Sequence, residues 1–344
     1  MDGGKRFLWW KRAVVLVVMT ISQLFSSSWA AEKAAVIKIA TVAPEGSAWT
    51  KAFNAINADV KKNTGDRVQL KIYAGGVLGD ERDMLRKMQI GQIHGAALSG
   101  GGLSNLFSEL DLFQIPFLFQ TYEEVDFLIE KMDPFFRKGF EDNGYVLLGW
   151  SEGGFVYLMT NAPMASVSEF KKAKVWIWED SPMAKAIFDE AGISAIPLSV
   201  PDVMVGLQTG LVDVVYAPPA GAISLQWFTK VKYILDVPLI YLVGGIVMRK
   251  DVFKGLPQPH QEALLEAFRA HVVPLRQVLR KENEEAIRVM ERHGVKVIKP
   301  AKEHVEEFKA LWDKAALRLG RQSFSKKVLD EASSLLQAYR RGNR

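Results

Sequence analysis

The chain contains no cysteine among its 344 residues. This absence excludes a disulfide scaffold, zinc held by thiolates, iron–sulfur clusters and thiol catalysis. Histidine is also scarce, because there are only five, and they form neither an HExxH sequence nor another metal-ligand spacing. The sequence therefore predicts no metal site and no cofactor.

Nucleotide-binding and most catalytic motifs are also missing. There is no P-loop, and the triplet Gly100-Gly101-Gly102 is followed by Asn105 where a dinucleotide-binding loop needs glycine. Residues 149–153 do fit the GxSxG pattern of serine hydrolases, with Ser151 as the nucleophile. That pattern requires a helix after the serine, whereas residues 155–160 are typical of a strand. We predict that the protein is not an enzyme, and a secreted serine hydrolase using Ser151 stays as the remote alternative.

The first 30 residues have the pattern of a secretory signal peptide. Four basic residues precede an apolar run at 13–25, and Ser28-Trp29-Ala30 provides a cleavage site. We expect cleavage after about Ala30 and export to the periplasm, with an uncleaved N-terminal anchor as the alternative. Four basic residues and one acidic residue would leave with the leader, so the formal charge would fall from +5 to +2. A nucleic-acid partner is therefore not expected.

Strand and helix patterns alternate after the leader. Residues 36–42 and 68–73 are strand-like, and between them Ser47 can cap a helix with Trp49, Phe53, Ile56 and Val60 on one face. This βαβ pattern predicts an α/β fold with a parallel sheet covered on both faces. In such sheets ligands bind beyond the carboxyl ends of the strands.

Two segments, 83–93 and 202–212, resemble each other. Each is helix-like, ends at a glycine and leads into an apolar strand, at 96–98 and 214–217. The likeness fits either a duplication or two ordinary helix-to-strand connections. Both interpretations predict two lobes of the same class.

A long helical pattern covers residues 258–293, with Pro274 expected to kink or divide it. At about 1.5 Å per residue such a helix would be ~50 Å long and could brace both lobes. We assign residues 31–154 and about 240–270 to lobe I. We assign residues 155–239 and about 294–344 to lobe II.

Several segments together resemble the substrate-binding proteins of TRAP transporters, the DctP family. They are 43–47 (APEGS), 73–80 (YAGGVLGD), 115–119 (IPFLF) and 207–213 (LQTGLVD). The resemblance implies a periplasmic-binding-protein fold of type II, with two lobes joined by two crossing strands and the long helix. It also implies that the lobes close over a small ligand, which is delivered to the membrane subunits of a TRAP permease.

The chain departs from the family pattern where the ligand is held. Most members carry an arginine that grips an organic acid through two parallel hydrogen bonds, and this sequence has Trp176 in its place. No arginine occurs between Arg137 and Arg249, and residues 214–219 (VVYAPP) lack the usual polar pair. These replacements predict a small neutral, amphipathic or apolar ligand. An organic acid held without the usual arginine is the main alternative.

The expected binding residues lie at strand ends and on one crossing strand. They are Trp49, Gly101, Phe155, Tyr157, Trp176, Trp178, Tyr216 and Pro218. A subgroup with this apolar pattern is thought to carry hydrophobic ligands with a periplasmic tetratricopeptide-repeat partner, and the resemblance suggests that subgroup for this chain.

Overall fold

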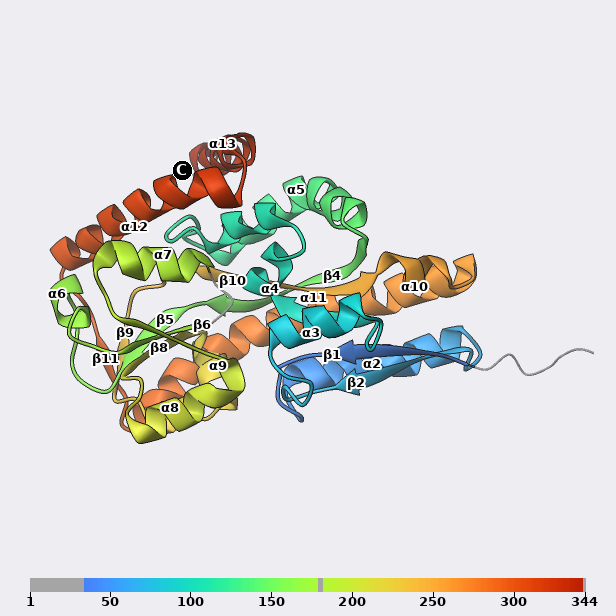
Figure 1. Ribbon diagram of the computed structural model, residues 1–344, viewed down its shortest axis with the longest axis horizontal. Helices are drawn as coiled ribbons and strands as arrows, with labels where there is room; N and C mark the ends of the chain where they lie inside the picture. The colour runs from blue at the N-terminus through green and yellow to red at the C-terminus, as the bar shows by residue number, and fades with distance from the viewer. Residues whose placement is uncertain (1–33, 179–181, 343–344) are drawn as a thin grey trace, which may run out of the picture. The chain divides into compact units, whose positions relative to one another are not determined.

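The computed structural model describes residues 34–178 and 182–342. From Val36 onward the chain forms one compact unit containing two β-sheets and the helices around them (Figure 1). The predicted signal peptide lies outside the described residues. Among the described helices, none is long and apolar enough to cross a membrane.

The first sheet has five strands in the order β2-β1-β3-β10-β4. β1 and β3 are parallel, whereas β10 is antiparallel to both β3 and β4. Their bounds are β1 (Ala35–Ala40), β2 (Val68–Tyr73), β3 (Gly95–Ser99), β4 (Tyr145–Phe155) and β10 (Tyr241–Arg249). With α2 (Ala48–Asn63), α3 (Glu81–Gln89), α4 (Gly100–Ser104), η1 (Ser108–Gln114), α5 (Tyr122–Asp142) and α10 (Lys250–Lys254), this sheet makes lobe I.

The second sheet has six strands in the order β11-β9-β5-β8-β6-β7. Their bounds are β5 (Tyr157–Thr160), β6 (Val175–Trp178), β7 (Ala195–Leu198), β8 (Val214–Ala217), β9 (Tyr233–Leu235) and β11 (Lys296–Ile298). The helices of this lobe, lobe II, are α6 (Val167–Phe170), α7 (Pro182–Ala191), η2 (Val200–Asp202), α8 (Val203–Thr209), α9 (Pro219–Ser224), η3 (Trp227–Thr229) and α12 (Lys302–Ser323).

Both sheets are mixed, which differs from the parallel sheet predicted from the βαβ pattern. In lobe II, β5 is antiparallel to β8 and β9, while β6 is parallel to β7 and β8. The antiparallel strands are β10 in lobe I and β5 in lobe II, and each comes directly after a crossing between the lobes. Each therefore runs opposite to the strands of its sheet that belong to βα units. The local pattern of β1, α2 and β2 carries no information about these returning strands.

Two chain crossings join the lobes. β4 continues into β5 through Val156, and the chain returns from β9 to β10 through residues 236–240. The crossings pair with each other, because Val156 N–H donates to the Ile240 carbonyl at 3.0 Å and Leu239 N–H donates to the Val156 carbonyl at 2.9 Å. Gly154 lies beside this pairing with φ +101°, a conformation that favours glycine, and a Cβ there would lie 2.4 Å from the Asn283 amide nitrogen.

The long helix α11 (Gln258–Arg292) is continuous, and Pro274 lies inside it without dividing it. It packs against α2 and β4 in lobe I and against α9 in lobe II. Asn283 of α11 forms a hydrogen bond with each lobe. Its amide donates to the Gly153 carbonyl of β4 at 2.7 Å, and its side-chain oxygen accepts from the Ala220 N–H of α9 at 2.9 Å.

The last two helices belong to different lobes. α12 packs on α7 in lobe II, but α13 (Lys326–Gly342) packs on α5 in lobe I, at the upper left of Figure 1. Val328, Ala332 and Leu336 are buried in the lobe I core. Within residues 294–344, which the sequence assigned to lobe II, α13 thus packs its apolar face on α5 and η1 of lobe I. The lobe boundaries stay a prediction.

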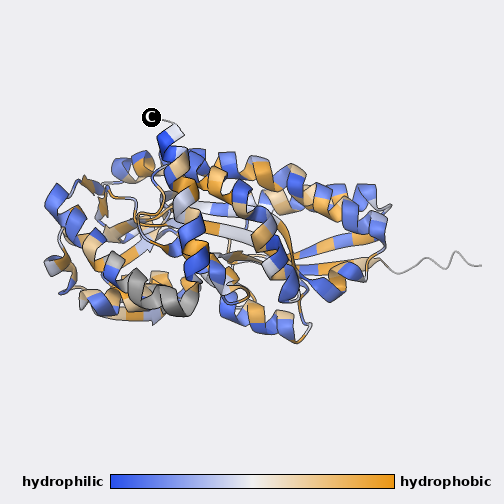
Figure 2. Ribbon diagram, turned by 90° about the horizontal axis from the view of Figure 1, so that it is seen from above, coloured by the Kyte–Doolittle hydropathy of each residue, from blue (hydrophilic) through white to orange (hydrophobic). Residues whose placement is uncertain are grey.

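The cores follow the alternation of side chains along strands. Helices in Figure 2 show hydrophobic and hydrophilic residues by turns along their length, as expected for helices with one buried face. In β6, Val175 and Ile177 pack on one face of the second sheet, whereas Trp176 packs on the other. The face carrying Trp176 is also the one that borders the candidate site.

Candidate functional site

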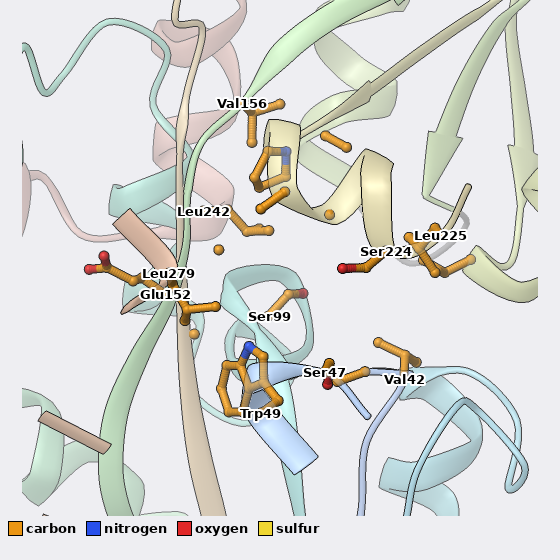
Figure 3. A pocket seen from close by; sticks show the side chains of 18 of the residues that line it. Val42, Ser47, Trp49, Ser99, Glu152, Val156, Ser224, Leu225, Leu242 and Leu279 are labelled. Atoms are coloured by element: carbon orange, nitrogen blue, oxygen red, sulfur yellow. The ribbon is translucent and has the colours of Figure 1, made fainter. Parts of the chain in front are cut away.

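One cavity of about 220 Å³ is lined by residues of both lobes. Lobe I contributes the segment after β1, the end of β3, and parts of β4 and β10. Lobe II contributes β6, the end of β8 and helix α9, and α11 adds Leu279 and Glu282. Figure 3 shows side chains from these elements around the cavity, with the Ser224 hydroxyl turned toward its middle. The carboxyl ends of parallel strands thus supply much of the wall.

Aromatic rings form the lobe II side. Trp176 stacks on Tyr216 with ring centroids 4.8 Å apart, meets Trp227 edge-on at 5.2 Å, and lies 6.4 Å from Trp178. Trp176 is only 2% exposed, and its indole N–H donates to the Leu198 carbonyl at 3.0 Å. Burial raises the pKa of Tyr216 to about 12, so its phenol stays neutral. The Trp176 ring is therefore both part of the core and part of the cavity wall.

The structure brings five of the eight predicted residues together at this cavity: Trp49, Trp176, Trp178, Tyr216 and Pro218. Gly101 lines a smaller cavity of about 60 Å³ that shares Trp178 and Tyr216. Phe155 and Tyr157 do not line the main cavity, because Val156 between them faces it and neighbouring side chains of an extended strand point the other way. Phe155 packs on Tyr122 and Tyr241 instead.

Several lining residues were not predicted from the sequence. Leu242 comes from the returning strand β10, Leu279 from α11, and Ser224 and Trp227 from the segment after β8. The last two come within ten residues of the strand predicted at 214–217, so that strand end could have pointed to them. The indole nitrogen of Trp227 is buried and has no hydrogen-bond partner among the described residues.

Three carboxylates line the cavity: Glu81, Glu152 and Glu282. Glu81 accepts hydrogen bonds from the Ser99 N–H at 2.7 Å and the Ser99 hydroxyl at 2.8 Å. Burial raises the pKa of Glu282, although the charge of Lys51 opposes the shift. The described lining includes no lysine, arginine or histidine. The electrostatic character of the wall is therefore neutral to negative.

Glu152 is 1% exposed and is neutralised by Arg280. Arg280 donates to its two oxygens at 2.6 and 2.8 Å and also binds Asp126 at 2.7 Å. Burial, the largest single influence, lowers the pKa of Arg280, but the hydrogen bonds with Asp126 and Glu152 and the charge of Glu152 together raise it. The Tyr241 hydroxyl donates to Glu152 as well. This guanidinium, which contacts a carboxylate of the cavity wall, thus already binds two carboxylates of the protein.

Ser151 is placed inside a strand and not at a turn. β4 runs unbroken from Tyr145 to Phe155, Ser151 is 1% exposed, and its hydroxyl has no hydrogen-bond partner among the described residues. A hydrolase nucleophile must instead stand exposed at a strand-to-helix turn. No group of three or more potential metal ligands occurs in the described part of the chain.

The sequence profile of the DctP family, described as bacterial extracellular solute-binding protein family 7, matches residues 39–322. The chain belongs to this family. It is a transport solute-binding family and not an enzyme family, so the prediction of a non-enzyme is confirmed and hydrolysis at Ser151 is set aside.

Individual relatives are distant. A solute-binding protein of Verminephrobacter eiseniae is 26% identical over 63% of this chain, but the match covers only 65% of that protein, less than two thirds. The C4-dicarboxylate-binding periplasmic protein DctP of Rhodobacter capsulatus is 22% identical over 75% of this chain and 78% of its own length.

The fold has close counterparts among solved structures. The sugar acid binding protein DctPAm of Advenella mimigardefordensis, in complex with galactonate, superposes with a TM-score of 0.83 at 19% identity, covering 89% of this chain and 99% of that chain. The predicted two-lobed α/β fold is thereby confirmed.

Proposed function

We propose that this DctP-family protein is the extracytoplasmic solute receptor of a TRAP transporter, and that it captures a small uncharged or amphipathic ligand between its lobes. The ligand would then pass to the membrane subunits of the permease. The single observation that carries the ligand class is the cavity wall, which has five indole or phenol rings and three carboxylates but no basic side chain in its described part.

Organic acids are the ligands named for the compared proteins, galactonate in one and C4-dicarboxylates in another. An acid in this cavity would lie close to Glu81 and Glu152, and the described lining offers no cation to pair with it. Such a buried, unpaired charge is costly. Tyr216, Ser224 and Trp227 offer neutral donors, which suit a carbonyl or hydroxyl oxygen better than a carboxylate.

Ligand selectivity tests the proposal. N-phenyl-1-naphthylamine, an uncharged fluorescent probe, should bind the purified protein, whereas succinate and galactonate should neither bind in calorimetry nor displace it. Trp49→Ala should weaken probe binding about tenfold or more, because it removes a large ring from the wall. The matched control is Trp150→Phe, since Trp150 is buried in lobe I away from the cavity. Tight succinate binding would favour the organic-acid alternative.

Export is a second expectation. Protein recovered from the periplasm should begin at Ala31 or within two or three residues of it, as N-terminal sequencing would show. An intact Met1 on membrane-extracted protein would instead indicate an uncleaved anchor. The tetratricopeptide-repeat partner also stays part of the proposal, and it rests on the resemblance to the apolar-ligand subgroup.

A further inference from the structure

Asp80 belongs to lobe I but binds lobe II. It lies between β2 and α3, and its Oδ1 accepts from the Glu81 N–H at 2.8 Å, which caps α3. Its Oδ2 accepts from the Trp178 indole N–H at 2.7 Å and from the Val200 N–H at 3.1 Å. Asp80 is 3% exposed. The two oxygens of the Asp80 carboxylate therefore accept hydrogen bonds from different lobes.

Trp178 is held from two sides. Its backbone N–H donates to the Tyr216 hydroxyl at 3.2 Å, while its indole donates to Asp80. Trp178 and Tyr216 both line the cavity. The two lobes also approach each other closely beside Trp178. A Cβ added to Gly76 of lobe I would lie 3.1 Å from Pro201 of lobe II. The position of this wall residue thus depends on lobe I being in place.

Asp80 has no positive partner in these contacts. Burial raises its pKa, and the hydrogen bonds from Glu81, Val200 and Trp178 oppose that rise only in part. Separation of the lobes would return the carboxylate to water and leave the Trp178 indole without its acceptor. Closing the lobes would therefore also fix the orientation of the Trp178 side chain in the cavity wall.

We infer that Asp80 is an interlobe latch and a positioning residue, which holds the lobes closed by binding the Trp178 indole and the Val200 N–H. The inference rests on the proposed function only in taking the cavity as the ligand site. The contact itself can be tested without any ligand.

The test measures interlobe distance by double electron–electron resonance. Because the chain has no cysteine, Lys62→Cys on α2 and Lys172→Cys after α6 give unique spin-label sites on exposed positions. Asp80→Asn keeps one oxygen for the α3 cap but turns an NH₂ group toward two donors. Trp178→Phe keeps a ring and removes only the indole N–H. Each substitution should lower the closed-to-open ratio about tenfold or more.

The controls separate a latch from a merely structural residue. Trp150→Phe deletes the same kind of bond, since the Trp150 indole donates to Asp133 at 2.5 Å, but both residues are in lobe I. It should leave the distance distribution unchanged. The double variant Asp80→Asn with Trp178→Phe should shift the ratio by less than the two single effects combined, because they share one bond.

Distances are measured without ligand and again with N-phenyl-1-naphthylamine. Unchanged closed populations in Asp80→Asn and Trp178→Phe would overturn the latch, as would a ligand-free wild-type protein with no closed population. Failure of the wild-type protein to bind the probe would instead count against the apolar site and leave the ligand-free comparison standing.

Discussion

Truncation of Trp176 to alanine should lower the free energy of unfolding by about 3–5 kcal/mol, the usual cost of deleting a buried aromatic ring. The residue is 2% exposed, stacked on Tyr216 and bonded to the Leu198 carbonyl. It also lines the cavity, so probe affinity should fall about a hundredfold. Urea unfolding followed by circular dichroism, together with probe titration below the transition, measures both effects.

The two roles of Trp176 can be separated by other substitutions. Trp176→Phe keeps a ring and should retain most of the stability, although the bond to Leu198 is lost. Trp176→Arg should abolish probe binding, because it replaces an apolar ring of the wall with a guanidinium that an uncharged probe cannot pair with. A variant that loses stability but binds the probe as well as the wild type would assign Trp176 to the core alone.

Replacement of Arg280 by methionine should cost about 3–5 kcal/mol of unfolding free energy, the range for breaking a buried ion pair. Glu152 would lose its cationic partner while only 1% exposed, with the Tyr241 hydroxyl still donating to it. Adding Glu152→Gln should restore part of the loss, since the uncompensated charge disappears. Urea unfolding of the two single variants and the double variant gives the coupling.

A surface ion pair provides the comparison. Lys185 and Asp189 on α7 are 2.7 Å apart with side chains 63% and 50% exposed. Lys185→Ala should change stability by less than about 1 kcal/mol. An Arg280→Met variant as stable as this control would mean that water reaches Glu152 readily.

Local sequence signals predicted much of the scaffold and part of the cavity wall. Ser47 accepts from the Thr50 N–H as the N-cap of α2, and Gly210 ends α8 with φ +68°. These features depend on neighbours a few residues away. The strand-end rule likewise brought Trp49, Trp176 and Tyr216 into consideration, since parallel strands end at one edge of a sheet.

The unpredicted parts depend on long-range pairing. Glu152 and Arg280 are 128 residues apart in sequence, and Asp80 and Trp178 are 98 apart. Strand β10 is apolar on both faces, so its sequence gives no register and no sign that Leu242 borders the cavity. Phe155 and Tyr157 do not line the described cavity, whereas Val156 between them does, and one residue of register decides which face of a strand a side chain takes.

The C-terminal helices limit how far the lobes can swing apart. α12 is fixed to α7 of lobe II, while Ser325 N–H donates to Glu109 at 2.8 Å and Arg340 binds Glu124 at 2.7 Å, both in lobe I. The chain between Ser323 and Lys326 therefore acts as a short tether across the hinge. Rotation beyond its reach would have to break one of these contacts, so we expect the tether to limit the opening angle more than the two crossing strands alone would.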